Sequence, residues 1–159
     1  MRLGDIFPQE DKYASFERQW HSRRIFRIDC VPPLVVRAKL KYLLLVVPDP
    51  QQPIFFFINS EINERVELDP RRRDGHVRIE QADCPCLTKD HSFVDCTKTI
   101  EVLTKSRIRY QALADLRRIG DEITMATTQQ IVAKIQGART FSRYQKRLMS
   151  DSLLGVPSK

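Results

Sequence analysis

The sequence contains no long hydrophobic run. Its longest apolar stretches, residues 42–48 and 53–58, are far shorter than the roughly 20 residues that a membrane-spanning helix needs. The first eight residues also lack the apolar core of a secretion signal. We therefore expect a cytoplasmic protein with no membrane partner, in which the four cysteines are reduced thiols.

Several motifs that define enzyme classes are missing as well. The chain has no Gly-rich phosphate loop, no H-E-x-x-H zinc motif and no G-x-S-x-G nucleophile elbow. Internal repeats and low-complexity tracts are also absent from the sequence. The sequence therefore argues against the enzyme classes that depend on those motifs.

What the sequence does have is a surplus of positive charge. Its 159 residues include 27 Lys and Arg against 20 Asp and Glu, a formal net charge of +7. Hydrophobic residues make up 42% and charged residues 30%, which is typical of a folded protein, and residues 1–159 are expected to form a single domain. A basic surplus indicates either a polyanionic partner, most often nucleic acid, or a soluble basic surface.

The centre of the chain has the pattern of β-strands. Residues 41–47 and 54–58 are apolar runs rich in β-formers, and the turn between them contains three prolines, so they predict a buried hairpin. Alternating charged and apolar residues predict strands at 64–68 and 76–79, and residues 99–103 are expected to form the last strand.

A helix is predicted before these strands. Tyr13, Phe16 and Trp20 are three and four residues apart among charged residues, which places them on one face of a short amphipathic helix within residues 12–27. Residues 31–33, Val-Pro-Pro, then break regular structure. The helix and the first strand are therefore expected on opposite sides of this break.

The C-terminal third has helical signals. One or two helical turns are expected over residues 110–119, and Gly120 stops them. Capping-box patterns at 127–130 and 142–145 predict the starts of two more helices, the first of which ends at Gly137. A compact β-unit followed by two or three small helices predicts a β-dominated α+β fold.

Four potential metal ligands, Cys84, Cys86, His91 and Cys96, lie within thirteen residues. Thiolates and imidazole suit zinc, but the C-x-C spacing differs from that of a zinc knuckle and no second pair follows. Small apolar core cysteines are the competing interpretation. A cysteine nucleophile beside His91 or His76 is a further alternative. We predict no metal and no other cofactor, with the four-residue zinc site as the alternative.

A different chemistry is suggested by the two ends of the predicted hairpin. Lys39 and Lys41 stand where one strand begins, and Asn59 and Ser60 stand where its partner ends, so the hairpin brings them close. Metal-free RNA cleavage needs a proton acceptor, a proton donor and cations for the phosphate, and a Lys beside a hydroxyl supplies much of this. On residue chemistry alone, the favoured interpretation is that the two lysines are solvated strand-start charges and Ser60 is a turn residue, because such pairs are common.

Basic clusters lie elsewhere along the chain. Arg71, Arg72 and Arg73 occupy a predicted charged turn over residues 69–75. Other cationic residues flank the C-terminal helices: Arg107, Arg109, Arg117, Arg118, Arg139, Arg143, Lys146 and Arg147. Each cluster is suited either to a nucleic-acid backbone or acidic partner, or to a solvated surface.

Three segments together resemble the PemK/MazF family of toxin endoribonucleases. Residues 4–7 (GDIF) are similar to the G-D-I-[YW] start of that family. The basic residue that leads the 41–47 strand, followed by a strand ending in a hydroxyl at 57–60 (FINS), resembles its central hairpin. Residues 87–96 (LTKDHSFVDC) look like its D-S-x-[VI] strand, and Ile-Gly at 119–120 before a helix resembles its usual ending.

The resemblance implies an SH3-like β-barrel with small helices. In this chain we expect the barrel strands within residues 31–104 and a helical part over 110–154, and the chain departs from the family in an N-terminal helical insertion that replaces the first loop. The resemblance also implies a homodimer, an inhibitory antitoxin partner, and metal-independent cleavage of single-stranded RNA. By position Lys41 would stabilise the phosphate and transfer protons, and Ser60 would orient the substrate.

From their place at the hairpin ends and in the basic turn, we also predict that Lys39 and Asn59, with the Arg71, Arg72 and Arg73 cluster, bind RNA. The family's R-P pair is Lys41 and Tyr42 here, and Lys is a poorer bidentate phosphate ligand than Arg. The alternative is a non-catalytic SH3-like module that binds nucleic acid or a protein.

Overall fold

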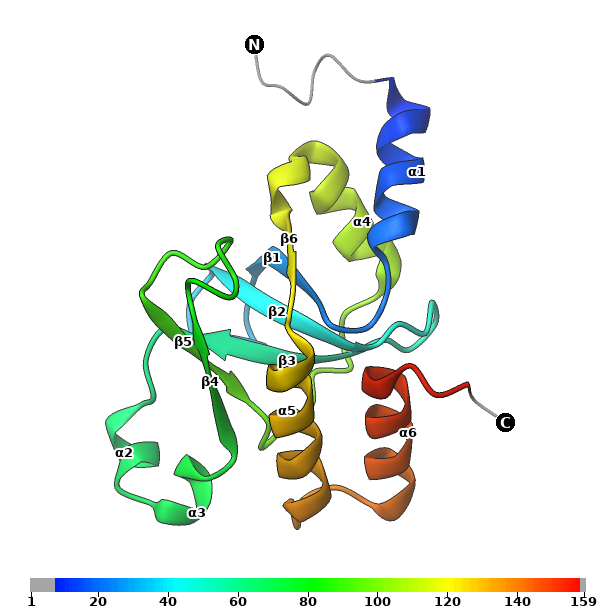
Figure 1. The fold of residues 1–159 in the computed structure, drawn as a ribbon. Helices are drawn as coiled ribbons and strands as arrows, with labels where there is room; N and C mark the ends of the chain where they lie inside the picture. The colour runs from blue at the N-terminus through cyan, green and yellow to red at the C-terminus, as the bar shows by residue number, and fades with distance from the viewer. Residues whose placement is uncertain (1–7, 158–159) are drawn as a thin grey trace.

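The computed structural model describes residues 8–157, which form a mixed α+β fold around one antiparallel sheet (Figure 1). Its strand order is β4-β5-β3-β2-β1-β6, and the sheet curls into a half-barrel. The strands are β1 (Arg24–Cys30), β2 (Lys39–Val47), β3 (Ile54–Asn59), β4 (His76–Glu80), β5 (His91–Asp95) and β6 (Ile119–Glu122). The helices are α1 (Gln9–Gln19), α2 (Glu64–Glu67), α3 (Pro70–Arg73), α4 (Lys105–Ala114), α5 (Met125–Gly137) and α6 (Arg143–Leu154).

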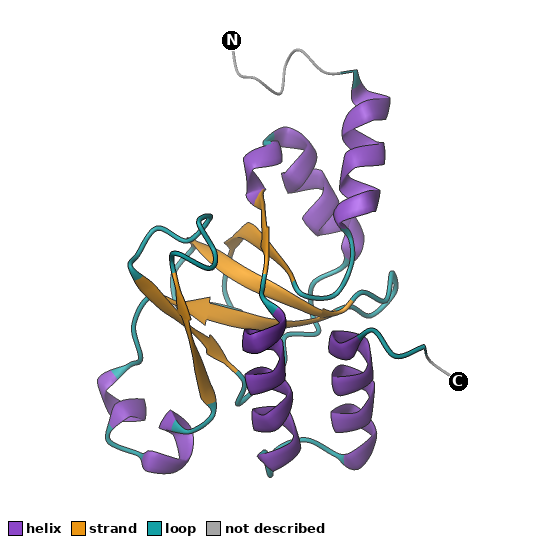
Figure 2. Ribbon diagram, viewed as in Figure 1, coloured by secondary structure: helices purple, strands orange, loops and turns teal. Residues whose placement is uncertain are grey.

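Helices lie on both faces of the sheet (Figure 2). Helices α5 and α6 pack on one face, and α1 and α4 pack on the other. In β2 and β3, Leu44 and Phe56 point to the α5/α6 side, whereas Leu43 and Phe57 point to the α1/α4 side. Both faces of the central hairpin are therefore buried, which explains its continuous apolar sequence and confirms the predicted hairpin.

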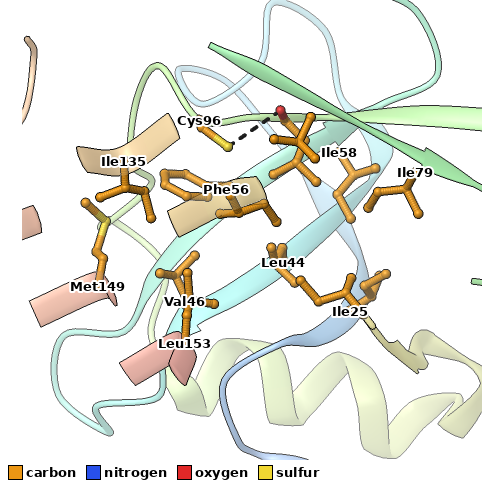
Figure 3. Close-up of a cluster of buried hydrophobic side chains, with 14 of the residues drawn as sticks. Ile25, Leu44, Val46, Phe56, Ile58, Ile79, Cys96, Ile135, Met149 and Leu153 are labelled. Atoms are coloured by element: carbon orange, nitrogen blue, oxygen red, sulfur yellow. Dashed lines mark hydrogen bonds between the residues drawn. The ribbon is translucent and has the colours of Figure 1, made fainter. Parts of the chain in front are cut away.

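The core on the α5/α6 side joins residues that are far apart in the sequence. Phe56 and Val46 of the central strands meet Ile135 of α5, together with Met149 and Leu153 of α6 (Figure 3). All five are buried. This layer fixes the position of the central hairpin from one side.

The core on the other side is aromatic. Phe16 of α1 and Trp20 lie against Phe26 of β1, with ring centroids 6.1 and 5.6 Å from that of Phe26. Trp20 also contacts Phe55 of β3 edge-on at 6.1 Å. The helical spacing of the predicted N-terminal helix is thus confirmed, and its apolar stripe is what anchors α1 to the sheet.

The prediction of a helix within residues 12–27 is wrong for its second half. Helix α1 ends at Gln19, and β1 begins at Arg24 after a turn in which Arg23 has a positive φ of 75°. Residues 24–30 form a strand because their alternate side chains, including Phe26 and Ile28, fill the aromatic core. With β6 paired to β1, the sheet extends on both sides of the predicted 31–104 range.

Two further strand predictions are wrong. Residues 64–68 contain the short helix α2, which Asn63 caps by accepting a 2.9 Å hydrogen bond from the Arg65 amide. Their alternating pattern fails to form a strand because none of the α2 side chains is buried. Residues 99–103 contribute only an isolated bridge, from Ile100 to Phe55. The charged turn expected at 69–75 contains helix α3.

The C-terminal helix predictions hold in outline. The capping box at Ser142 and Gln145 is confirmed, and Gly137 is the last residue of α5. The cap of α5 is Thr124 rather than Thr127, which lies buried in the first turn. The helix expected at 110–119 begins earlier, at Lys105, and gives way after Ala114 to a 3₁₀ turn and then to β6. The GDIF motif at 4–7 lies outside the described residues.

Candidate functional site

The α1/α4 face of the sheet is only partly covered. Its uncovered half, the open face, lies over β2, β3, β5 and β4 and carries Lys39, Lys41, Asn59, Phe93 and Arg78. Asn59 pairs with Phe93, and Phe93 pairs with Arg78, so these three side chains line up on one face across three strands. Lys39 and Arg78 are exposed and the other three are half-buried. The open face therefore offers cations, an amide and an aromatic ring to solvent.

Lys41 is the most unusual group on the open face. Its Nζ donates a hydrogen bond to Asn59 Oδ1 and lies 5.1 Å from the centroid of the Phe57 ring. Burial lowers the pKa of the Lys41 ammonium, and the charge of Lys39 lowers it further, against an opposing effect of Asp95. A lysine whose pKa is lowered gives up its proton more readily than a free lysine, so the neutral amine that can accept a proton from a substrate forms at lower pH.

The predicted site residues are only partly brought together. Lys41 and Asn59 are in direct contact, as the hairpin predicted. Lys39 lies two residues away on β2, paired with Cys30 of β1. Ser60 is the first residue after β3 and is exposed, and the side chain that meets Lys41 is that of Asn59. The catalytic role expected of Ser60 stays a prediction.

A second polar pair, which sequence reasoning missed, lies next to Lys41. His76 of β4 and Asp95 of β5 are paired in register, and His76 Nε2 is 3.7 Å from Asp95 Oδ1. Asp95 Oδ1 also accepts hydrogen bonds from the amide and the hydroxyl of Thr97, at 3.0 and 2.5 Å. The alternation of polar and apolar residues in β4 and β5 could have indicated two strands. The sequence contains no local pattern that predicts their pairing with each other.

The arginine cluster lies at the border of this region. Arg71, Arg72 and Arg73 form helix α3 with Pro70, and all three are exposed. His76 Nδ1 is 2.9 Å from the Arg72 carbonyl oxygen, which ties α3 to the end of β4. The cluster thus adds exposed positive charge beside the His76–Asp95 pair.

An open groove of about 410 Å³ adjoins Lys41. One wall is the segment 31–34 with its two prolines, and the other is the loop from Lys98 to Leu103. Phe57, whose ring lies beneath the Lys41 ammonium, also lines the groove, and Arg107 of α4 completes it. The groove is mostly apolar and two cations belong to its lining.

The cysteines do not form a metal site or an active thiol in the described part of the chain. Within residues 8–157 no three His, Cys, Asp or Glu side chains are grouped to hold a metal ion. Cys84 and Cys96 are buried in the α5/α6 core, and Cys30 is buried in the other core. Burial raises the pKa of Cys84 to about 12 and that of Cys86 to about 11. His91 lies edge-on against the Phe93 ring. The cysteines are therefore protonated core thiols.

Most other basic residues near α4 are paired. Arg109, Arg117 and Arg118 each have a carboxylate within 3.8 Å, from Glu17, Asp115 and Asp29 respectively. Such exposed pairs contribute little energy individually. Arg78 on the open face and Arg72 of α3 are paired in the same way, with Glu80 and Asp69. Within residues 8–157 the cations of the open face, α3 and the groove that make no ion pair are Lys39, Lys41, Arg71, Arg73, Lys98 and Arg107.

No protein-family model matches the chain, and no curated protein shows significant similarity to it. In the part of the chain that the structure describes, none of the helices is long and apolar enough to span a membrane.

Proposed function

We propose that this chain is a metal-independent endoribonuclease of the PemK/MazF-like toxin type, which binds single-stranded RNA on the open face and uses Lys41 as its catalytic residue. The observation that carries the proposal is the environment of Lys41. This half-buried lysine, with its lowered pKa, is held by Asn59 on a surface that also carries Lys39, the Phe93 ring, the Arg78–Glu80 ion pair and the His76–Asp95 pair.

The surface chemistry supports RNA as the ligand. Single-stranded nucleic acids bind to proteins through cations that contact phosphates and aromatic rings that stack on bases. Lys39 supplies an exposed cation, Phe93 supplies a half-buried ring, and Arg71 and Arg73 of α3 extend the positive charge, whereas Arg78 is paired with Glu80. The net charge of +7 favours association with a polyanion as a whole.

The proposed reaction is an internal transesterification. The 2′-oxygen bonds to the adjacent phosphorus, and the bond from phosphorus to the 5′-oxygen breaks. Lys41 as the neutral amine takes the 2′-hydroxyl proton and, as the ammonium, returns a proton to the departing 5′-oxygen. The products are a 2′,3′-cyclic phosphate and a 5′-hydroxyl. Asn59 positions the Lys41 amine, and Ser60 is proposed to orient the substrate at the end of β3.

The proposal extends to the fold and the partners. We take the curled sheet to be an SH3-like barrel of the PemK/MazF type, with α1 and β1 in place of the family's first loop. A homodimer, an inhibitory antitoxin and a cytoplasmic location belong to the same proposal. The antiparallel curled sheet and the three helices after residue 104 support it.

The test is cleavage by the purified chain in the presence of EDTA. Single-stranded RNA should be cut, and the new ends should carry cyclic phosphate and 5′-hydroxyl groups. Expression of the chain should also arrest growth. Binding of RNA without any cleavage would instead favour the non-catalytic binding module, and the absence of both would contradict the proposal.

A further inference from the structure

The groove beside Lys41 has no role in the chemistry described above. It is formed by two segments that are distant in the sequence, residues 31–34 before β2 and the loop from Lys98 to Leu103 after β5. Its walls include Pro32, Pro33 and Val102, and Val102 is 74% exposed. An exposed apolar wall of this kind favours an apolar or aromatic group as its occupant.

The charge of the groove restricts the occupant further. Lys98 and Arg107 line it, both are exposed, and within residues 8–157 neither makes an ion pair. None of the described residues that line the groove carries a carboxylate. An occupant that is flat and apolar on one side and anionic on the other matches this combination, and a nucleotide has that form.

The position of the groove links it to Lys41. The Phe57 ring lines the groove and also lies 5.1 Å from Lys41 Nζ. The groove volume of about 410 Å³ falls within the range of about 300 to 1,000 Å³ that is typical of small-ligand pockets. A group of nucleotide size seated there would lie against the Phe57 ring, which separates it from the Lys41 amine.

We propose that the groove between residues 31–34 and 98–103 is a nucleotide subsite, in which the base lies against Pro33 and Val102 and the phosphate contacts Lys98 and Arg107. This inference rests on the proposed function, since the bound nucleotide is one of the RNA chain that Lys41 cleaves. Thr99 is the uncharged polar side chain in the lining, so the subsite selects bases by shape and stacking more than by hydrogen bonds.

The base half of the subsite is tested with a fully 2′-O-methylated single-stranded oligonucleotide, which cannot be cleaved, and with a matched oligonucleotide of abasic units. Val102→Asp should weaken binding of the first oligonucleotide at least tenfold. The matched control is Val36→Asp, because Val36 is 95% exposed and lies outside the groove, and it should change affinity less than twofold. Wild type should prefer the oligonucleotide with bases, and Val102→Asp should reduce this preference.

The phosphate half is tested by the salt dependence of binding. Lys98→Gln should reduce the slope of log K against log salt by about 0.7, as expected for the loss of one phosphate contact. Lys134→Gln, on α5 at the other face of the sheet, should leave the slope unchanged. Equal slopes for both variants would overturn the assignment of Lys98.

The outcomes separate the two proposals. If wild type binds the oligonucleotide and Val102→Asp binds it as well as Val36→Asp does, the subsite is wrong and the groove serves another ligand, while RNA binding on the open face stands. If wild type binds no RNA at all, the proposed function and the subsite fail together. A loss of affinity confined to Val102→Asp and Lys98→Gln supports the subsite, and cleavage of unmodified RNA in EDTA then tests the proposed function separately.

Discussion

The two faces of the sheet differ in how far helices cover them. On one face α5 and α6 complete a core that extends from Ile25 of β1 to Val77 of β4. On the other face α1 and α4 cover Phe26 and Phe55 but leave the half that carries Lys41 uncovered. A half-face that carries cations and a half-buried aromatic ring, while the opposite face of the same strands β3, β4 and β5 is buried under an apolar core, indicates that this uncovered half serves binding rather than stability.

The largest effect on stability is expected from the covered face. Phe56→Ala removes a fully buried ring between the sheet and α5/α6 and should lower the free energy of unfolding by about 3–5 kcal/mol. Chemical denaturation monitored by circular dichroism measures this change. A loss below about 1 kcal/mol would mean that the α5/α6 core does not hold the sheet as described.

Phe93, the aromatic residue on the open face, should matter little for stability and strongly for RNA binding. Phe93→Ala should cost about 1 kcal/mol or less in stability, because the ring is half-buried, but should weaken RNA binding about tenfold through lost stacking. Fluorescence anisotropy with single-stranded RNA gives the affinity. Unchanged affinity together with a large loss of stability would make Phe93 a core residue and remove it from the binding surface.

The pH dependence of RNA cleavage tests whether Lys41 accepts a proton as the neutral amine. Because burial lowers the pKa of Lys41 from 10.5, the neutral amine forms at lower pH, and cleavage should rise with pH and level off before that value. In the unfolded chain Lys41 has its ordinary pKa and binds its proton more tightly than in the folded protein. The contribution of Lys41 to folding stability therefore rises with pH between the lowered pKa of the folded state and the ordinary pKa of the unfolded state.

Initial cleavage rates measured between about pH 6 and about pH 9 show this rise directly. Lys41→Arg should bind RNA but lose the pH-dependent activity, since a guanidinium stays protonated throughout the range. A pH-independent rate in the wild type, after subtraction of uncatalysed RNA hydrolysis, would contradict the role of Lys41 as a proton acceptor.

The smallest effect is expected from metal removal. Dialysis against EDTA should leave the thermal midpoint unchanged, because the cysteines are core thiols rather than ligands. Metal analysis of protein purified without chelator should find less than about a tenth of an equivalent of zinc. A lowered midpoint that zinc restores would reinstate the alternative site at Cys84, Cys86, His91 and Cys96.

The fold was predictable where the sequence signal is local. Continuous apolar runs predicted the central hairpin, and the capping box at Ser142 predicted the start of α6. The strand β1 was missed because Arg27 and Asp29, on its exposed side, resemble the charged face of a helix. Helix α2 was missed because short exposed helices depend on a single cap, here Asn63, rather than on periodicity.

The candidate site, like the fold, was predictable where it depends on residues that are close in the sequence. The contact of Lys41 with Asn59 follows from hairpin pairing, which is a short-range property. The His76–Asp95 pair and the groove depend on β5 inserting between β3 and β4, and on the path of the loop that follows it. These are long-range pairings, and no spacing of residues along the chain encodes them.

The most direct test of the account is the rate of RNA cleavage by Lys41→Ala in EDTA, compared with Lys134→Ala. Both lysines are half-buried, but Lys134 lies on α5 at the other face of the sheet. We expect Lys41→Ala to lose activity about 100-fold or more while retaining its fold, and Lys134→Ala to cleave at the wild-type rate. Equal cleavage by the two folded variants would contradict the catalytic role of Lys41.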